Sequence, residues 1–267
     1  MTDTTATTTP PTQPPGNPII EAVVDIECEL RPGFDLAATE APATAALGDS
    51  YPTVQKQVML EQQVTAQLNP SAPPQATLTP VRSALIALRL QQADGKQIVQ
   101  IRASGYSFNR LAAYTSFDDY APEIRRTWEL YCRLVEPVRI RQISLRYINR
   151  IELPFDAGKL DLDRFLALGP RLADESRLTF TGFLHQHSVL EPSTGNLATI
   201  TLTPQPQAPG ATHLPIILDI AAHRQEPIEV GDWTAIHTGL SSLRSLNNHI
   251  FHQSLTVPCR QLYPSLP

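Results

Sequence analysis

The stretch VRIRQISLRYINRIEL, residues 138–153, decides the fold of this chain. Apolar and polar residues alternate along it, which is the pattern of a half-buried β-strand. Val138 and Ile140 share one parity, whereas the main apolar run from Ile143 onward has the other. We expect a β-bulge near Arg141, because one extra residue changes the face on which the following side chains lie. The stretch therefore predicts one long, bulged strand whose outer face carries arginines.

The first strand of the chain, residues 20–30, carries the opposite charge. Its even positions are apolar, and its odd positions include Glu21, Asp25, Glu27 and Glu29. If the two strands are neighbours, these acids lie beside Arg146 and Arg150. Exposed cross-strand ion pairs stabilise a sheet by about 0.2–1 kcal/mol each. The first interpretation of the arginines is therefore a structural charge ladder.

A recognition surface for an acidic or phosphate-bearing ligand is the second interpretation. Guanidinium groups bind carboxylates and phosphates through paired hydrogen bonds, and aromatic rings can stack on a ligand. The candidate binding residues are arginines expected on one sheet face and two aromatic residues near them: Arg146, Arg150, Arg102, Arg110, Arg89, Phe108 and Tyr106. The interleaved acids argue against nucleic acid, because they restore much of the repulsion that the arginines remove.

Hydrophobic periodicity and breaker residues predict further elements on both sides of the central stretch. Before it, we expect a helix at 36–47, a strand at 58–68, a hairpin at 84–103 around Asp94-Gly95, an extended segment at 106–114 and a helix at 116–136. After it, we expect a short helix at 160–168, strands at 178–190, 197–202 and 216–222, and a long helix at 233–255. Each strand has one apolar face and each long helix one apolar stripe, so helices should pack on one face of an antiparallel sheet.

The elements occur in the same order twice, about 120 residues apart, as for Ile20 and Ile143 or for Ser116 and Asp232. This offset indicates an internal duplication, although unrelated elements could also agree by chance. The predicted fold class is α+β, with two β-α-β(3-4)-α repeats that form one curved antiparallel sheet and two long helices on one face. The expected boundaries are a Thr/Pro-rich disordered tail at 1–17, repeats at 18–137 and 138–257, and a C-terminal extension at 258–267.

This order of elements resembles the TATA-binding-protein-like fold. The resemblance implies that the first strands of the two halves pair at the centre of one continuous sheet. Strand 20–30 would then lie beside strand 142–153, with acids facing arginines.

Composition limits the classes of function. The chain has 267 residues, 42% apolar and 18% charged, and lacks any run of about 20 apolar residues that could span a membrane. Its formal net charge of -5 disfavours a nucleic-acid partner. Three scattered cysteines and the absence of a secretory signal at the N-terminus favour a cytoplasmic, reducing location.

Motifs for catalysis are absent from the sequence: it has no Gly-rich phosphate loop, no Gly-x-Ser-x-Gly elbow and no His-Glu-x-x-His. We expect no catalytic residues and no cofactor, and we favour a non-enzymatic role. His185, His187 and His223 are weak candidates for a metal site, and ordinary surface histidines are the favoured alternative. Asn149 and Asn247 interrupt apolar patterns, so they either hydrogen-bond within the core or line a ligand cavity between helices and sheet.

Several stretches of the chain resemble a sporadically distributed prokaryotic family of about 250 residues without an assigned function. They are Asn17–Val23, Phe108–Leu111, Trp128–Tyr131, Leu145–Ile151 (LRYINRI) and Leu246–Phe251. The scattered distribution implies an accessory role in mobile defence, toxin–antitoxin or immunity systems. The family's Lys-Asn-x-Ile-Phe ending appears here as Asn247-Asn248-His249-Ile250-Phe251, which leaves any role of that lysine in doubt.

The favoured function is a non-catalytic binding or interaction protein, with a protein partner or a homo-oligomer and without a membrane. A nucleic-acid-binding protein that uses the concave sheet face is one alternative. An enzyme or metal-binding protein with a site assembled from scattered residues is the other.

Overall fold

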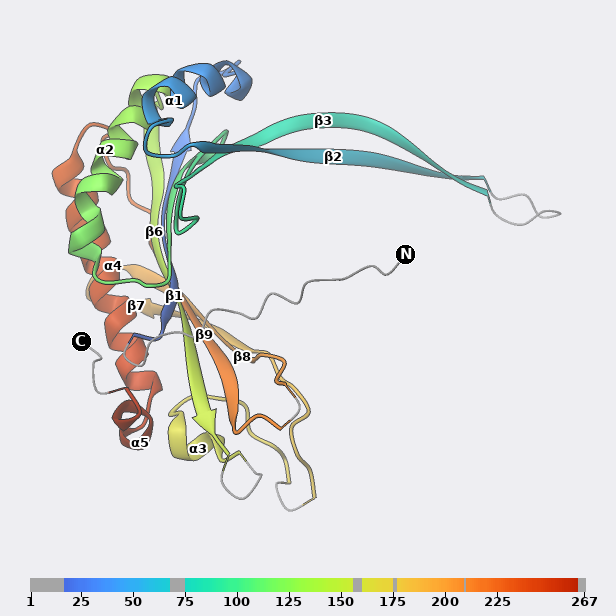
Figure 1. Cartoon of the computed structure of the whole chain (residues 1–267), viewed down its shortest axis with the longest axis vertical. Helices are drawn as coiled ribbons and strands as arrows, with labels where there is room; N and C mark the ends of the chain where they lie inside the picture. The colour runs from blue at the N-terminus through green and yellow to red at the C-terminus, as the bar shows by residue number, and fades with distance from the viewer. Residues whose placement is uncertain (1–16, 68–74, 156–159, 175–176, 209, 264–267) are drawn as a thin grey trace.

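The computed structural model of the chain describes residues 17–67, 75–155, 160–174, 177–208 and 210–263, which form one nine-stranded antiparallel sheet with helices packed against it (Figure 1). The α+β class with an antiparallel sheet is thereby confirmed. The strands are β1 (Ile19–Glu29), β2 (Thr53–Gln67), β3 (Gln75–Gln91), β4 (Gln97–Arg102), β5 (Gly105–Leu111), β6 (Arg139–Pro154), β7 (His185–Glu191), β8 (Asn196–Pro204) and β9 (His213–Arg224). The helices are the 3-10 helix η1 (Leu36–Thr39) and α1 (Glu40–Leu47), α2 (Phe117–Val135), α3 (Leu162–Phe165), α4 (Trp233–Ser254) and α5 (Val257–Gln261).

The centre of the sheet is the antiparallel pair of β1 and β6, with Val23 opposite Arg146. The register shifts by one residue where Gln142 pairs with Glu27 and Ile140 pairs with Cys28. Arg141 is therefore the extra residue of a bulge, as its sequence position predicts. The predicted adjacency of these two strands is confirmed.

The strands continue outward from this centre in two series. Next to β1 follow β5, β4, β3 and β2, and next to β6 follow β9, β8 and β7. The strand predicted at 178–190 is shorter in the structure, where β7 begins at His185. Pairing further upstream would reach Pro204, which ends β8 and has no N–H to donate. The predicted helix at 160–168 is reduced to the single turn of α3.

Helices α2 and α4 cover one face of the sheet (Figure 1). Each begins at a capping side chain, because Ser116 accepts a hydrogen bond from the N–H of Asp119 and Asp232 accepts one from Ala235. Helix α4 approaches β6 closely: a Cβ on Gly239 would lie 2.4 Å from Cδ1 of Ile143. The core lies between these two helices and the inner side chains of the sheet.

Two buried asparagines hold this core by hydrogen bonds. Nδ2 of Asn247 on α4 donates to the carbonyl of Leu145 on β6 at 2.9 Å. Nδ2 of Asn149 donates to the carbonyl of Leu218 at 3.0 Å, so this residue joins β6 to β9. Both side-chain amides thus donate hydrogen bonds within the core, as the first of the two interpretations predicts.

Strands β2 and β3 extend well beyond the rest of the sheet. Strand β4 pairs only with Ala87–Gln91 of β3, whereas β2 pairs with β3 from Thr53 to Gln67. The remainder is a two-stranded ribbon that projects from the body of the molecule (Figure 1). We call residues 58–67 and 75–86 the arm. The expected N-terminal tail falls almost wholly on residues 1–16, which lie outside the described residues.

Candidate binding face of the sheet

The sheet face that points away from α2 and α4 is not covered by a described helix, and we call it the open face (Figure 1). The labelled strands of the sheet curve around this face (Figure 1). Residues opposite one another in an antiparallel ladder point to the same face, so the registers assign the paired positions, and the bulge residue Arg141 is placed by its hydrogen bond to Glu29. The uncharged polar residues on the open face include Thr53, Gln55, Gln57, Gln91, Gln100, Ser107, Asn109, Gln142, Ser144, Gln186, Ser188, Thr199, Thr201 and Thr203.

Charges on the open face are balanced within the described part of the chain, which places as many carboxylates there as guanidinium groups. The carboxylates belong to Glu21, Asp25, Glu27, Glu29, Glu152 and Asp219. The guanidinium groups belong to Arg89, Arg102, Arg139, Arg141, Arg146 and Arg150. The face is therefore close to neutral, although the whole chain is acidic, and it also carries apolar residues such as Val23, Ile148 and Leu190.

Most of these arginines are already paired with acids of the same face. Arg102 lies 2.6 Å from a carboxylate oxygen of Asp25, and Nε of Arg150 lies 2.7 Å from Glu152. Arg146 binds both carboxylate oxygens of a single acid, with 2.8 Å from its Nε to Oδ1 of Asp219. Such bidentate pairs are the strong form of the arginine–carboxylate interaction.

A second cluster of charge lies at the bulge. Glu29 of β1 accepts hydrogen bonds from Nε of Arg139 at 2.7 Å and from Nη2 of Arg141 at 3.1 Å. These two bonds, the one from Arg139 foremost, hold the pKa of Glu29 below its ordinary value. An acid of β1 thus faces arginines of β6 at this end of the strands. Arg146 and Arg150, which the sequence places beside the acids of β1, bind Asp219 and Glu152 instead.

The open face brings together Arg146, Arg150, Arg102 and Arg89 of the candidate binding residues. The other three candidates lie on the opposite face, which differs from the expectation that the arginines share one face. Tyr106 and Phe108 are buried beneath α2, and the guanidinium group of Arg110 lies 5.1 Å from the ring centre of Tyr120 on that helix. The reason is the tight β4–β5 turn, which pairs Arg102 with Gly105 and so places the even positions of β5 on the inner face.

Sequence reasoning missed Asp219 as the partner of Arg146 and missed the uncharged polar residues of β8. Both had a signal. Asp219 interrupts the apolar run Ile216–Ala222, and the stretch TITLT at residues 199–203 alternates threonine with an apolar residue. That alternation indicates a strand with one polar face.

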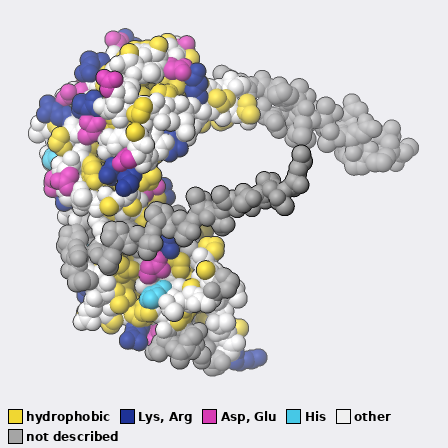
Figure 2. All heavy atoms as spheres, viewed as in Figure 1, with side chains coloured by type: hydrophobic (Ala, Val, Ile, Leu, Met, Phe, Trp, Pro, Cys, Tyr) yellow, Lys and Arg dark blue, Asp and Glu magenta, His cyan; other side chains and the backbone are white. Residues whose placement is uncertain are grey.

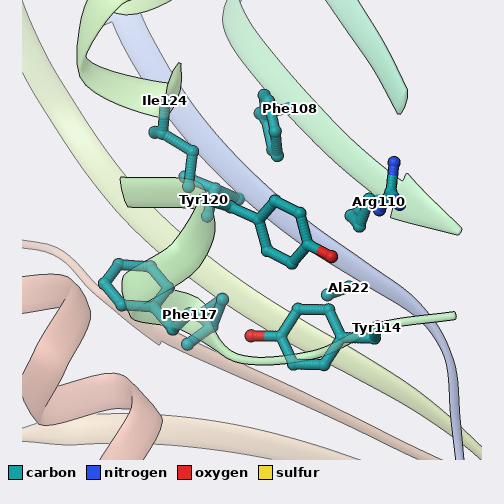
Figure 3. A pocket seen from close by; sticks show the side chains of 9 residues that line it. Ala22, Phe108, Arg110, Tyr114, Phe117, Tyr120 and Ile124 are labelled. Atoms are coloured by element: carbon teal, nitrogen blue, oxygen red, sulfur yellow. The ribbon is translucent and has the colours of Figure 1, made fainter. Parts of the chain in front are cut away.

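A cavity lies on the inner face, beneath the start of α2 (Figure 3). Tyr114, Phe117, Tyr120 and Arg110 line it together with apolar side chains of β1 and β5. Its volume of about 10 Å³ leaves room for one water molecule. An organic ligand would therefore need the helix to move, which does not favour the ligand-cavity interpretation.

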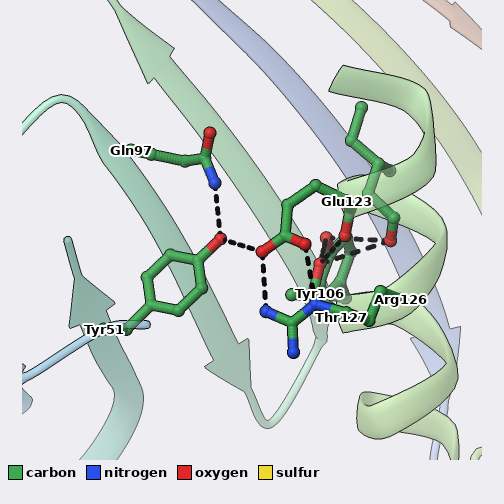
Figure 4. Close-up of polar contacts among 7 residues, drawn as sticks. Tyr51, Gln97, Tyr106, Glu123, Arg126 and Thr127 are labelled. Carbon is green, nitrogen blue, oxygen red and sulfur yellow. Dashed lines mark hydrogen bonds and ion pairs between the residues drawn. The ribbon is translucent and has the colours of Figure 1, made fainter. Parts of the chain in front are cut away.

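A polar network joins the segment after α1 to α2 and β4 (Figure 4). The hydroxyl of Tyr51 donates to Glu123 at 2.7 Å and accepts from the Nε2 of Gln97 at 2.6 Å. Arg126 donates twice to the same Glu123 carboxylate, at 2.7 Å each. Partial burial acts to raise the pKa of Glu123, but the bonds from Arg126 and Tyr51 outweigh it and hold that pKa below its ordinary value. The network is closed by its own members, as expected of a structural element.

The candidate metal ligands do not converge. His185 and His187 have ring centres 5.3 Å apart on the inner side of β7. His223 pairs with Leu197 on the open face, so the sheet separates it from the other two. Nor do the described residues contain a cluster of three or more His, Cys, Asp or Glu that could hold a metal ion.

The cysteines are free thiols that burial protects from reaction. Burial raises the pKa of both Cys28 and Cys132 to about 12, and that of Cys259 to about 11. Because the thiolate is the nucleophile, none of them is activated for catalysis. Among the helices in the described ranges, none is long and apolar enough to cross a membrane.

No family model matches the chain, and a search of curated proteins finds no match.

Proposed function

We propose that this chain is a non-catalytic binding protein that holds a partner protein on its open face. The observation that carries the proposal is the pairing of Arg102, Arg146 and Arg150 with carboxylates of the same face. A neutral face with many hydrogen-bonding groups suits a protein surface, because non-obligate protein interfaces are about as polar as the rest of a protein surface. The curvature of the sheet supports the same conclusion, because a concave sheet face can fit a convex partner.

A polyanion would suit this face less well. Nucleic-acid affinity comes largely from cations that neutralise phosphates, and an arginine already bonded to a carboxylate supplies little of that attraction. We therefore do not include nucleic-acid binding in the proposal, and the experiment below would detect it. The proposal includes an accessory role in a mobile defence or toxin–antitoxin system and a cytoplasmic location. The identity of the neighbouring genes would test the accessory role.

We also propose that the two halves of the chain arose by internal duplication. The order of strands supports it, because β1 continues to β5, β4 and β3 as β6 continues to β9, β8 and β7. The long helices α2 and α4 then occupy corresponding places after β5 and β9. Under this interpretation the open face is formed by both repeats, with β1 and β6 at its middle.

Affinity purification with matched variants tests the binding proposal. The tagged full chain is incubated with lysate of its source organism, beside Thr199→Arg on the open face and Ser245→Arg on the exposed side of α4. We expect a protein that binds the parent chain and Ser245→Arg but not Thr199→Arg.

Two results would contradict the proposal. One is retention of the same proteins by all three chains, because the open face would then contribute nothing. The other is nuclease-sensitive recovery of nucleic acid that disappears with Arg146→Ala, because the face would then bind a polyanion.

A further inference from the structure

Strand β2 ends the sheet, and no described strand pairs with its outer edge. Unpaired edges normally carry protection against association, such as proline, bulges or inward-pointing charges. The 15 residues of β2 contain no proline and no glycine. Their one lysine, Lys56, is bound to Glu40 of α1 at 2.7 Å and so is held to the inner side of the strand. The salt bridge offsets the one inward charge that would protect this edge, and no charged residue, proline or glycine lies from Gln57 to Leu60.

Three consecutive apolar residues of β2 are exposed. The exposed fractions are 49% for Val58, 47% for Met59 and 67% for Leu60. Hydrophobic side chains are visible at this base of the arm in Figure 2. Because the three residues point to both faces of the ribbon, a helix packed on one face would leave part of them exposed. A strand added beside β2 would place neighbouring side chains next to them on both faces.

The ladder with β3 leaves β2 regular. The register shifts twice, between Gln57 and Val58 and between Glu61 and Gln62, and in both places the extra residue belongs to β3. Alternation along β2 is therefore unbroken from Thr53 to Gln67. Its outer N–H and C=O groups form a continuous row that another strand can pair with.

The sequence of β2 indicates which strand pairs with this edge, because it reads almost the same in both directions. Around Met59, the stretch TVQKQV at 53–58 mirrors LEQQVT at 60–65. The symmetric positions hold Thr53 with Thr65, Val54 with Val64, Gln55 with Gln63, Lys56 with Gln62, Gln57 with Glu61, and Val58 with Leu60. Like residues therefore occupy opposite positions if two copies of β2 pair antiparallel about Met59.

Other symmetric registers match much less well. A two-fold axis perpendicular to the sheet requires the axis to pass at a residue, so the nearest alternatives are centred on Val58 or Leu60. They would place Lys56 opposite Leu60 or Val64, a charge against an apolar residue. Centring on Lys56 or Glu61 would place like charges together, which is destabilising.

We propose that β2 is a homodimerisation edge, at which two copies of this chain pair antiparallel with Met59 opposite Met59 of the partner subunit. The two sheets then form one continuous sheet with isologous symmetry. Because the axis is perpendicular to the sheet, both open faces lie on the same side. This inference does not depend on what the open face binds.

Cysteine crosslinking in the full chain tests the register. The native cysteines are buried or partly buried, so a new thiol at an exposed edge position reports contact between copies. Under mild oxidation, we expect Met59→Cys to give a covalent dimer at least about ten times more efficiently than Gln55→Cys, because a disulfide needs closely spaced residues. In the proposed register Gln55 lies opposite Gln63 of the partner subunit. The two thiols introduced by Gln55→Cys are then about eight positions, or about 26 Å, apart.

Sedimentation measures the assembly without crosslinks. We expect the parent chain to sediment as a dimer and Leu60→Lys to sediment as a monomer. Leu184→Lys, at a residue that is 70% exposed and distant from β2 in the sheet order, should remain a dimer. A monomeric parent chain at about 100 μM, or equal crosslinking of Gln55→Cys and Met59→Cys, would overturn the proposal.

Discussion

Arg146 of β6 forms its bidentate ion pair with Asp219 of β9, whereas the residue directly opposite it on β1 is the apolar Val23. At this position the ion pair therefore joins β6 to β9, and not β6 to β1 as the sequence predicts. Arg146 is about half exposed, but the side chain of Asp219 is only 16% exposed. The pair thus ties β6 to the outer strands of its own half.

A double-mutant cycle on this pair measures that coupling. We expect Arg146→Ala and Asp219→Ala each to lower the free energy of unfolding by about 0.5–1 kcal/mol, with a coupling energy of about 0.5 kcal/mol. Urea unfolding gives the values. The matched control is the exposed pair Arg125 and Glu129 on α2, whose coupling should be no larger. A coupling of zero for Arg146 and Asp219 would show that the pair contributes nothing to stability.

Gly239 allows α4 to approach β6, so its replacement should be costly. An added Cβ would meet Cδ1 of Ile143 at 2.4 Å. We expect Gly239→Ala to lower the free energy of unfolding by about 1–3 kcal/mol, although alanine favours helices. Ser245→Ala, on the exposed side of the same helix, should be neutral or slightly stabilising. The cost is expected because Ile143 is fully buried and its Cδ1 has to turn within the packed core. A rise in stability for Gly239→Ala would show instead that this side chain turns aside freely.

The hydroxyl of Tyr51 bridges a buried amide and a carboxylate. Tyr51→Phe leaves Gln97 without this partner, and we expect a loss of about 1–2 kcal/mol in unfolding free energy. Thermal or urea unfolding measures it. In Gln97→Leu, the same tyrosine substitution should cost less, because the buried amide that needs the hydroxyl is gone. Equal costs in both backgrounds would contradict the bridge.

Acid should weaken the same network. The folded-state pKa of Glu123 lies below the ordinary value of 4.5, so its contribution is fully present above about pH 4.5 and is lost as the pH falls through the lower folded pKa. We expect Glu123→Gln to be less stable than the parent chain at neutral pH and to lose less stability on acidification. Melting temperatures between about pH 3 and pH 7 test this. Tyr51→Phe keeps the carboxylate and should give an intermediate slope, whereas parallel curves for all three chains would contradict the account.

The centre of the fold could be predicted from the sequence because its signals are local. Alternation in residues 138–153 locates the strand and its bulge, and the opposite charges of residues 20–30 indicate its neighbour. Asp219 stands out as a polar interruption of an apolar run, but its pairing with Arg146 depends on the register between β6 and β9, which the sequence does not specify. The face of Tyr106, Phe108 and Arg110 depends on the turn before Gly105, where a shift of one residue would exchange the two faces.

Site-specific photocrosslinking tests the binding role of the open face most directly. A benzophenone side chain is placed at Gln100 or Thr199, one on each half of the open face, and at Ser245 on the outer side of α4 as the control. After irradiation in native lysate, we predict that both open-face positions capture the same protein and that Ser245 does not. Capture of that protein from Ser245 alone, or capture of nucleic acid from the open face, would contradict the proposal.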